Sequence, residues 1–148
     1  MPYTQLRYHL IIATKSRRPW LTSDVEDIVY PAFARTFERL DCTLFRAGGI
    51  EDHVHFVCSI PPKLAVSHVA GRLKCESTRL VKSRRDDLDE FEWGGNFSAF
   101  TLNPFDLSEI IAYVENQKEH HKNDELRDEL EQLPTPPTVR TKQPPGVR

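Results

Sequence analysis

The sequence contains no apolar run long enough to cross a membrane, few cysteines and almost no net charge. None of its hydrophobic segments approaches the ~18 consecutive apolar residues of a membrane span, and its first residues, Met-Pro-Tyr-Thr-Gln, lack a charged-then-apolar signal pattern. The three cysteines lack C-x-x-C spacing, which indicates reduced, packed thiols and not metal ligands. We therefore expect a cytoplasmic protein with no membrane partner.

A net charge of -2 over 148 residues does not suggest a nucleic-acid partner, but the charges are unevenly distributed. Residues 1–20 carry four bases and no acid, and residues 72–85 carry six bases against one acid, whereas residues 106–133 hold nine acids against three bases. A local basic surface can bind phosphates, although each charge run is also compatible with a solvated face. The candidate phosphate contacts are Lys15, Arg17, Arg18, Arg72, Arg79 and Lys82.

Two histidines stand two residues apart in an apolar run that is typical of a strand, residues 52–60. A strand has a period of two, so His53 and His55 share one face while Val54 and Phe56 point to the other. Two neutral imidazoles on a rigid strand are suited to binding a divalent metal. An H-x-H pattern also occurs as a half-exposed pair without metal, so the pattern requires a third ligand elsewhere in the chain.

The remaining periodicities predict a strand, helix, strand, strand, helix, strand order. Strands are expected at 8–14, 43–47, 52–60 and 93–102, with a bend or bulge at Gly48-Gly49. One helix is expected from a capping box at Ser23, with a kink or break near Tyr30 because Pro31 sits inside it, and another over about 66–82. This order predicts an α+β, ferredoxin-like fold: a four-stranded antiparallel sheet with helices on one face.

A third helix is extra to that unit. It is expected to start at a capping-box-like Asp106 and to carry Tyr113 and Gln117 one turn apart along the border of its apolar stripe. Read alone, a tyrosine there is more typical of a core residue. His120, one turn further, could touch DNA or be solvated. From Pro134 the chain holds five of its 11 prolines and few apolar residues, so residues 134–148 are expected to be a disordered tail.

Five segments occur in an order that resembles the single-tyrosine HUH transposases, small enzymes that move insertion sequences as single-stranded DNA. They are His53-Val54-His55, Pro61-Pro62-Lys63, Leu73-Lys74, Trp93-Gly94-Gly95 and Tyr113-Val114-Glu115-Asn116-Gln117. Each motif is weak alone, but H-hydrophobic-H on a strand with Y-x-x-x-Q on a late helix is specific in combination. The resemblance implies one HUH transposase domain over residues 1–133, with the extra helix as its catalytic helix.

The resemblance also implies roles for individual residues. His53, His55 and Gln117 would bind a divalent metal, Mg²⁺ or Mn²⁺, and Tyr113 would be the nucleophile that forms a 5′-phosphotyrosine link. The implied partner is single-stranded DNA with hairpin ends, met at the nucleoid. The implied assembly is a homodimer in which each subunit's catalytic helix completes the partner's histidine site.

Two alternatives stay open at this point. Another HUH nuclease, such as a replication initiator or relaxase, would use the same residues on a different DNA. A ferredoxin-like nucleic-acid-binding module without catalysis would bind DNA without metal and form no covalent adduct.

Overall fold

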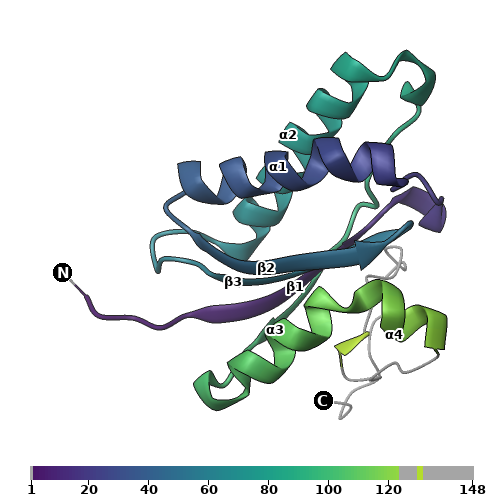
Figure 1. The fold of residues 1–148 in the computed structure, drawn as a ribbon. Coiled ribbons are helices and arrows are strands. Elements are labelled where there is room, and N and C mark those ends of the chain that lie inside the picture. Colours follow the sequence, from purple (N-terminus) through teal and green to yellow (C-terminus); the bar gives the residue numbers. More distant parts are fainter. Residues whose placement is uncertain (1, 124–129, 132–148) are drawn as a thin grey trace, which may run out of the picture.

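The chain folds into three layers, with one sheet between two sets of helices (Figure 1). The computed structural model describes residues 2–123 and 130–131. Its strands are β1 (Arg7–Ala13), β2 (Thr43–Ile50), β3 (His53–Ser59) and β4 (Ser98–Thr101). Its α-helices are α1 (Ser23–Arg39), α2 (Val66–Arg84), α3 (Leu107–Glu115) and α4 (Gln117–Asn123), and short 3-10 turns lie at Lys15–Arg17, Asp86–Leu88 and Pro104–Asp106.

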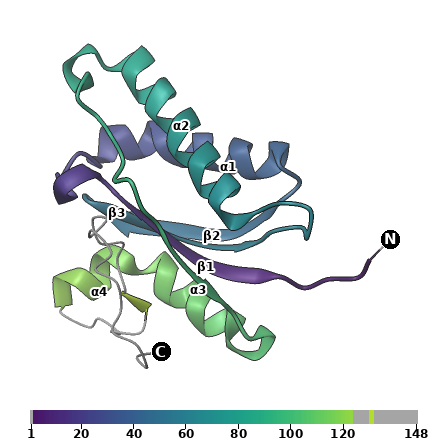
Figure 2. The same cartoon turned by 180° about the vertical axis from the view of Figure 1, so that it is seen from behind.

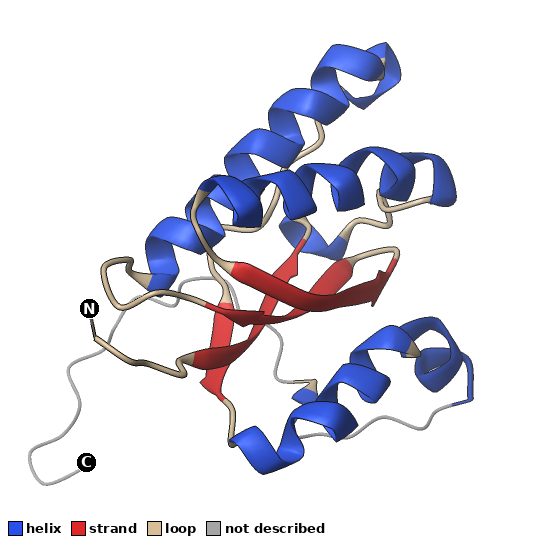
Figure 3. Cartoon of the chain, turned by 60° about the vertical axis from the view of Figure 1, so that its left-hand side comes forward, coloured by secondary structure: helices blue, strands red, loops and turns tan. Residues whose placement is uncertain are grey.

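The sheet has the order β2-β3-β1-β4, and its described neighbours are all antiparallel. This confirms the predicted ferredoxin-like α+β fold. Figure 3 shows the strands with α1 and α2 on one side and α3 and α4 on the other. Figure 2 shows the segment after α2 returning along β1 before it reaches α3. The helices that follow the ferredoxin-like unit therefore cover the second face of the sheet.

The larger core fills the space between the sheet and helices α1 and α2. Alternate residues of β1 and β3, including Leu10, Ile12, Val54 and Phe56, are fully buried there against Phe33 of α1. Phe33 and Phe56 meet edge to face, with ring centroids 4.9 Å apart. Because side chains alternate along a strand, this core leaves His53 and His55 to the opposite face, as predicted.

The second face holds a smaller cluster beneath α3. Ile110, Tyr113 and Val114 of that helix pack on Val57 of β3, and Leu130 closes the cluster. Helix α3 lies very close to β2, because a Cβ atom at Gly48 would sit 2.0 Å from the Val114 carbonyl oxygen. Glycine at position 48 is therefore what allows the tyrosine-bearing helix to reach the sheet.

Two predicted irregularities are absent from the structure. Helix α1 continues through Pro31 as one element. Asp27 and Pro31 are both exposed, so water can satisfy the carbonyl group that the proline leaves without a donor. Gly48 and Gly49 do not form a bend; they continue β2, and the register shift falls between Leu44 and Arg46.

The extents of two predicted elements and the capping hydrogen bonds of two helices are also corrected. The segment 93–102 is a strand only over Ser98–Thr101, and Trp93 forms an isolated bridge to Thr14. The expected late helix is divided at Asn116 into α3 and α4. The N-cap residues of α1 and α3 are Thr22 and Asp106, and neither side chain makes a capping hydrogen bond.

Other expectations concern the thiols, the membrane and the tail. Cys58 is buried as predicted, Cys42 is half-buried, and Cys75 is exposed and not packed. Across the described ranges, no helix is long and apolar enough to span a membrane. The predicted tail, residues 134–148, and the end of the predicted 1–133 domain lie outside the described residues.

Candidate metal and tyrosine site

Strand β3 presents both histidines toward α3 and α4, and both are fully buried. His53 Nδ1–H donates to Asp52 Oδ1 at 2.7 Å, and His55 Nδ1 lies 2.7 Å from His9 Nε2 on β1. Each imidazole is thus held through Nδ1, which leaves both Nε2 atoms directed toward one point. Glu131 occupies that point, with Oε2 at 3.4 Å from His53 Nε2 and 3.2 Å from His55 Nε2.

Tyr113 reaches the same carboxylate from α3. Its side chain is 4% exposed, and its hydroxyl donates a 2.7 Å hydrogen bond to Glu131 Oε1. The tyrosine ring lies edge-on to His55, with centroids 6.3 Å apart, and stacks on His120 at 4.5 Å. The structure therefore brings Tyr113, His53 and His55 of one chain together, and packs His120 on the tyrosine.

Glu131 is the residue that the sequence analysis missed. It lies in the acidic segment after α4, 76 residues from His55 in the sequence, and no motif or spacing distinguishes it from the other acids there. Burial acts to raise the pKa of Glu131, but its contacts with His53 and His55 outweigh burial and hold that pKa far below its ordinary value. Glu131 is therefore an ionised carboxylate at the centre of the site.

The electrostatic environments of the histidines differ. Burial acts to lower the pKa of His53, but the carboxylates of Asp52 and Glu131 outweigh it, so the pKa of His53 is raised. Burial lowers the pKa of His55 despite its bond to Glu131. Burial, and then the charge of His55, lower the pKa of His9 to about 3. His9 and His55 are thus neutral near pH 7, while His53 binds a proton more readily.

Gln117 is the first residue of α4, two residues beyond the end of the tyrosine helix. It is 1% exposed, and its Oε1 accepts a 3.1 Å hydrogen bond from His121 Nε2–H. His121 Nε2 lies 3.5 Å from Glu131 Oε1, and the His121 ring centroid is 5.0 Å from that of His53. Gln117 thus adjoins the site through His121, and its Nε2 has no hydrogen-bond partner within residues 2–123 and 130–131.

The group His53, His55 and Glu131 fits a divalent metal. Their ligand atoms lie within 4.8 Å of one another. Ligands about 2.1 Å from an octahedral metal lie about 3 Å apart, close to the two nitrogen–oxygen separations seen here. His53 Nε2 is buried and makes no hydrogen bond within the described part of the chain. Two imidazoles and one carboxylate are also a common donor set for divalent metals.

Arg17 belongs to the edge of this site. Its Nη2 lies 3.1 Å from Asp52 Oδ2 and 3.5 Å from His53 Nδ1. Ser16 and Arg17 both have φ of 55°, a conformation that non-glycine residues adopt at a cost, and this turn places the guanidinium beside the histidine strand. Arg17 is therefore a predicted phosphate contact that lies next to the candidate metal ligand His53.

The other predicted phosphate contacts fall into two regions. Lys15, Arg18 and Lys82 line one cavity of about 320 Å³, where Lys15 pairs with Glu92 and Arg18 with Glu90. Arg79 lines another cavity, of about 230 Å³, together with Arg35 and Arg39. Arg72 is hydrogen-bonded to the buried Glu76. The structure thus does not gather the six predicted bases into one patch.

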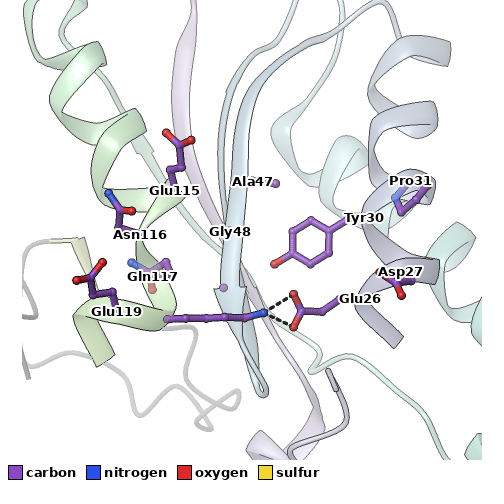
Figure 4. A pocket seen from close by; sticks show the side chains of 12 residues that line it. Glu26, Asp27, Tyr30, Pro31, Ala47, Gly48, Glu115, Asn116, Gln117 and Glu119 are labelled. Carbon is purple, nitrogen blue, oxygen red and sulfur yellow. Dashed lines mark hydrogen bonds and ion pairs between the residues drawn. The ribbon is translucent and has the colours of Figure 1, made fainter. Parts of the chain in front are cut away.

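A larger cavity of about 630 Å³ lies between α1, the edge strand β2 and the turn from α3 to α4 (Figure 4). Lys118 and Glu26, which both line it, are hydrogen-bonded, with Nζ–oxygen distances of 2.7 and 2.9 Å. Acidic side chains dominate its charged lining: Glu26, Asp27, Glu115 and Glu119. Because these charges repel phosphate, this cavity is unsuited to bind a DNA backbone.

Comparison with known proteins decides the family. The family described as "Transposase IS200 like" matches residues 2–117, a range that includes His53, His55, Tyr113 and Gln117. The chain belongs to the IS200-like transposase family. This confirms the predicted resemblance, and it separates this transposase from the replication initiators and relaxases that the motifs alone left open.

Two curated relatives and two solved structures are similar to this IS200-like transposase. The transposase for insertion sequence element IS200 of Salmonella typhimurium is 27% identical over 122 residues, 78% of this chain and 79% of that protein. The ISDra2 transposase TnpA of Deinococcus radiodurans is 28% identical over 118 residues, covering 76% and 84% of the two chains.

The solved structures support the fold. A Deinococcus radiodurans R1 protein assigned as a transposase superposes with a TM-score of 0.61 at 23% identity, covering 78% of this chain and 93% of that one. A REP-associated tyrosine transposase bound to a REP hairpin gives a TM-score of 0.63 at 14% identity, covering 85% and 73%.

Proposed function

We propose that this IS200-like transposase nicks and rejoins single-stranded DNA through a 5′-phosphotyrosine intermediate on Tyr113. The observation that carries the proposal is the convergence of the Tyr113 hydroxyl and two buried histidine Nε2 atoms on the carboxylate of Glu131. A buried tyrosine needs a hydrogen-bond partner, but it does not need to share that partner with two imidazoles. The arrangement is better suited to chemistry than to packing.

In the proposed reaction the Tyr113 oxygen attacks a backbone phosphorus. A phosphorus–oxygen bond to the tyrosine forms, the bond to the 3′ oxygen breaks, the phenol loses its proton and the departing oxygen gains one. Attack by the 3′ hydroxyl of another strand reverses these changes, so rejoining needs no ATP. Because the pKa of Glu131 lies far below the ~10 of a phenol, Glu131 orients the tyrosine hydroxyl and is a weak proton acceptor.

The divalent metal, Mg²⁺ or Mn²⁺, would be held by His53, His55 and Glu131. Gln117 remains a proposed ligand at the edge of this group. When bound, the metal would offset charge on the scissile phosphate and on the departing oxygen. The carboxylate supplies a negative charge that the amide of Gln117 lacks, which favours Glu131 as the third ligand. Asp52, which accepts from His53 Nδ1–H, keeps the Nε2 atom of that histidine directed inward.

The proposed substrate is a hairpin-forming single strand of DNA at insertion-sequence ends. We propose that the protein is cytoplasmic and associates with the nucleoid when it acts on this DNA. One structural neighbour is a transposase bound to a hairpin, which supports this substrate class.

We also propose a homodimer that exchanges α3 between subunits. Exchange of an identical element would preserve the contacts seen within one chain, and the link before α3 carries Phe105, which is 92% exposed.

The proposal is tested by mixing the protein with hairpin-forming single strands and Mn²⁺ and looking for a denaturation-resistant protein–DNA band. Tyr113→Phe should abolish the band, and the matched variant Tyr30→Phe, which changes another tyrosine, should keep it. His53→Ala and chelation should also abolish it while DNA binding persists. An undiminished adduct in Tyr113→Phe excludes this nucleophile; DNA binding without any adduct favours a non-catalytic module.

A further inference from the structure

His9 is a fully buried histidine for which the proposed chemistry has no direct use. It lies on β1, opposite Val57 in the register. It therefore shares the second face of the sheet, the one beneath α3, with His55 as a diagonal neighbour. Its ring stacks on His55 with centroids 5.0 Å apart and planes inclined by 16°. Phe100 packs on it at 6.1 Å.

One nitrogen of His9 makes a short contact and the other makes none. His9 Nε2 lies 2.7 Å from His55 Nδ1, whereas His9 Nδ1 has no hydrogen-bond partner among residues 2–123 and 130–131. Burying an imidazole with one nitrogen unsatisfied costs free energy that an apolar side chain in this place would not cost. Within the part of the chain that the structure describes, the contact with His55 is the hydrogen bond that His9 can make in return.

That contact determines which nitrogen of His55 is available for a metal. A neutral imidazole that ligates through Nε2 carries its proton on Nδ1, and this proton needs an acceptor when it is buried. His9 Nε2 is in place to accept it, as Asp52 Oδ1 accepts from His53. The two histidines are therefore supported through the same atom by different partners, one charged and one neutral.

We propose that His9 is a positioning residue that holds His55 in the Nδ1–H tautomer, with Nε2 directed at the metal. The inference deepens the proposed function and rests on its metal site. A neutral partner has a consequence that a second carboxylate would not have. Asp52 and Glu131 already bring two negative charges to the histidine pair, and His9 fixes His55 without adding a third.

Three variants separate the hydrogen bond from simple packing. His9→Phe keeps a ring that can stack on His55 but removes the acceptor, and His9→Gln restores a side-chain acceptor near the position of Nε2. Ile11→Val, opposite His55 in the register, is the control for a small change of packing. Mn²⁺ affinity is measured by calorimetry and by electron paramagnetic resonance, with circular dichroism to confirm folding.

His9→Phe should weaken Mn²⁺ binding by ~10–100-fold, the range typical of lost outer-shell partners, and His9→Gln should recover most of it. Ile11→Val should bind as the wild type does. Equal affinity of wild type and His9→Phe overturns the role of His9 alone, as does His9→Gln being as weak as His9→Phe. Absence of Mn²⁺ binding by the wild type overturns the metal site and this inference with it.

A measurement on the wild-type protein needs no variant to fold. Long-range ¹H–¹⁵N spectra of the Mg²⁺-loaded protein report which histidine nitrogens carry protons. His55 should show a protonated Nδ1 and an unprotonated Nε2. A protonated Nε2 on His55 in the metal-loaded protein overturns the proposal.

Discussion

The hydroxyl of Tyr113 donates a 2.7 Å hydrogen bond to Oε1 of Glu131. The second oxygen of that carboxylate lies 3.2 Å from His55 Nε2, so a single side chain connects the candidate nucleophile to the candidate metal ligands. Any change at Glu131 should therefore affect both the metal and the tyrosine.

Glu131→Gln should weaken Mn²⁺ binding by more than about tenfold, because a neutral amide replaces a charged ligand in direct contact with both histidines. Gln117→Ala should have a smaller effect if the carboxylate is the third ligand. Glu119→Gln, which removes an exposed acid from α4, is the matched control and should leave Mn²⁺ affinity unchanged. A larger loss in Gln117→Ala than in Glu131→Gln would return the ligand role to the amide.

Gly48→Ala should displace α3 from the sheet and reduce adduct formation, since the new methyl group would overlap the Val114 carbonyl oxygen. We expect the free energy of unfolding to fall by about 1–3 kcal/mol. Gly71→Ala on α2 is the control, because its Cβ atom would meet nothing within 4 Å. That control should be neutral or stabilising by up to ~1 kcal/mol. Equal stability and equal adduct yield for both variants would show that glycine at position 48 is not needed for α3 to pack on the sheet.

Mixing His55→Ala with Tyr113→Phe should restore adduct formation if α3 is exchanged in a homodimer. One composite site of the mixed dimer would then contain an intact tyrosine and intact histidines, with recovery toward half of wild type per mixed dimer. Each variant alone, co-expressed with itself, is the control. If mixed dimers are shown to be present and stay inactive, the active site is built within one chain, through the contacts of Glu131 with Tyr113 and His55.

Arg79→Gln and Lys82→Gln should each lower the affinity for single-stranded DNA to a similar extent across sequences. Each neutralised phosphate contact should reduce the slope of log affinity against log salt by ~0.7 for a single strand. Lys63→Gln, which changes an exposed base paired with Asp41, is the control of equal charge change. An unchanged slope in both test variants would identify these bases as a solvated face.

The stability of the metal-free protein should decrease as the pH falls below about 6.5, in part because of His9. Its pKa is about 3 in the folded state, against the ordinary value of 6.5, through burial first and then the charge of His55. The unfolded chain therefore binds more protons between these values, and the stabilisation present above pH 6.5 is lost as the pH falls.

Replacing His9 should accordingly flatten the pH dependence. Between pH 7 and 4.5, His9→Phe should lose about 2 kcal/mol less of its unfolding free energy than the wild type. Phe100→Leu, which changes the ring on the other side of His9 without removing a titrating group, should keep the wild-type dependence. Urea unfolding in chelator at several pH values measures both. Parallel curves for wild type and His9→Phe would show that His9 does not contribute.

The sequence by itself determined the features that depend on local periodicity. The alternation along residues 53–58 requires His53 and His55 to share a face, and the structure confirms this together with the four-stranded ferredoxin-like sheet. Helical spacing likewise predicted that Tyr113 lies at the border of an apolar stripe. These features follow from the pleat of a strand and the turn of a helix, which neighbouring residues set without reference to the rest of the chain.

Only the tertiary structure decided which distant residues meet at those positions. The β1–β3 register places His9 diagonally beside His55, and the tertiary structure places Glu131 between the histidines and Tyr113. Gly48 suggests a bend in the sequence, yet it is the point where the backbone of α3 approaches β2. Register and close approach depend on how all the elements pack together, and no local spacing encodes them.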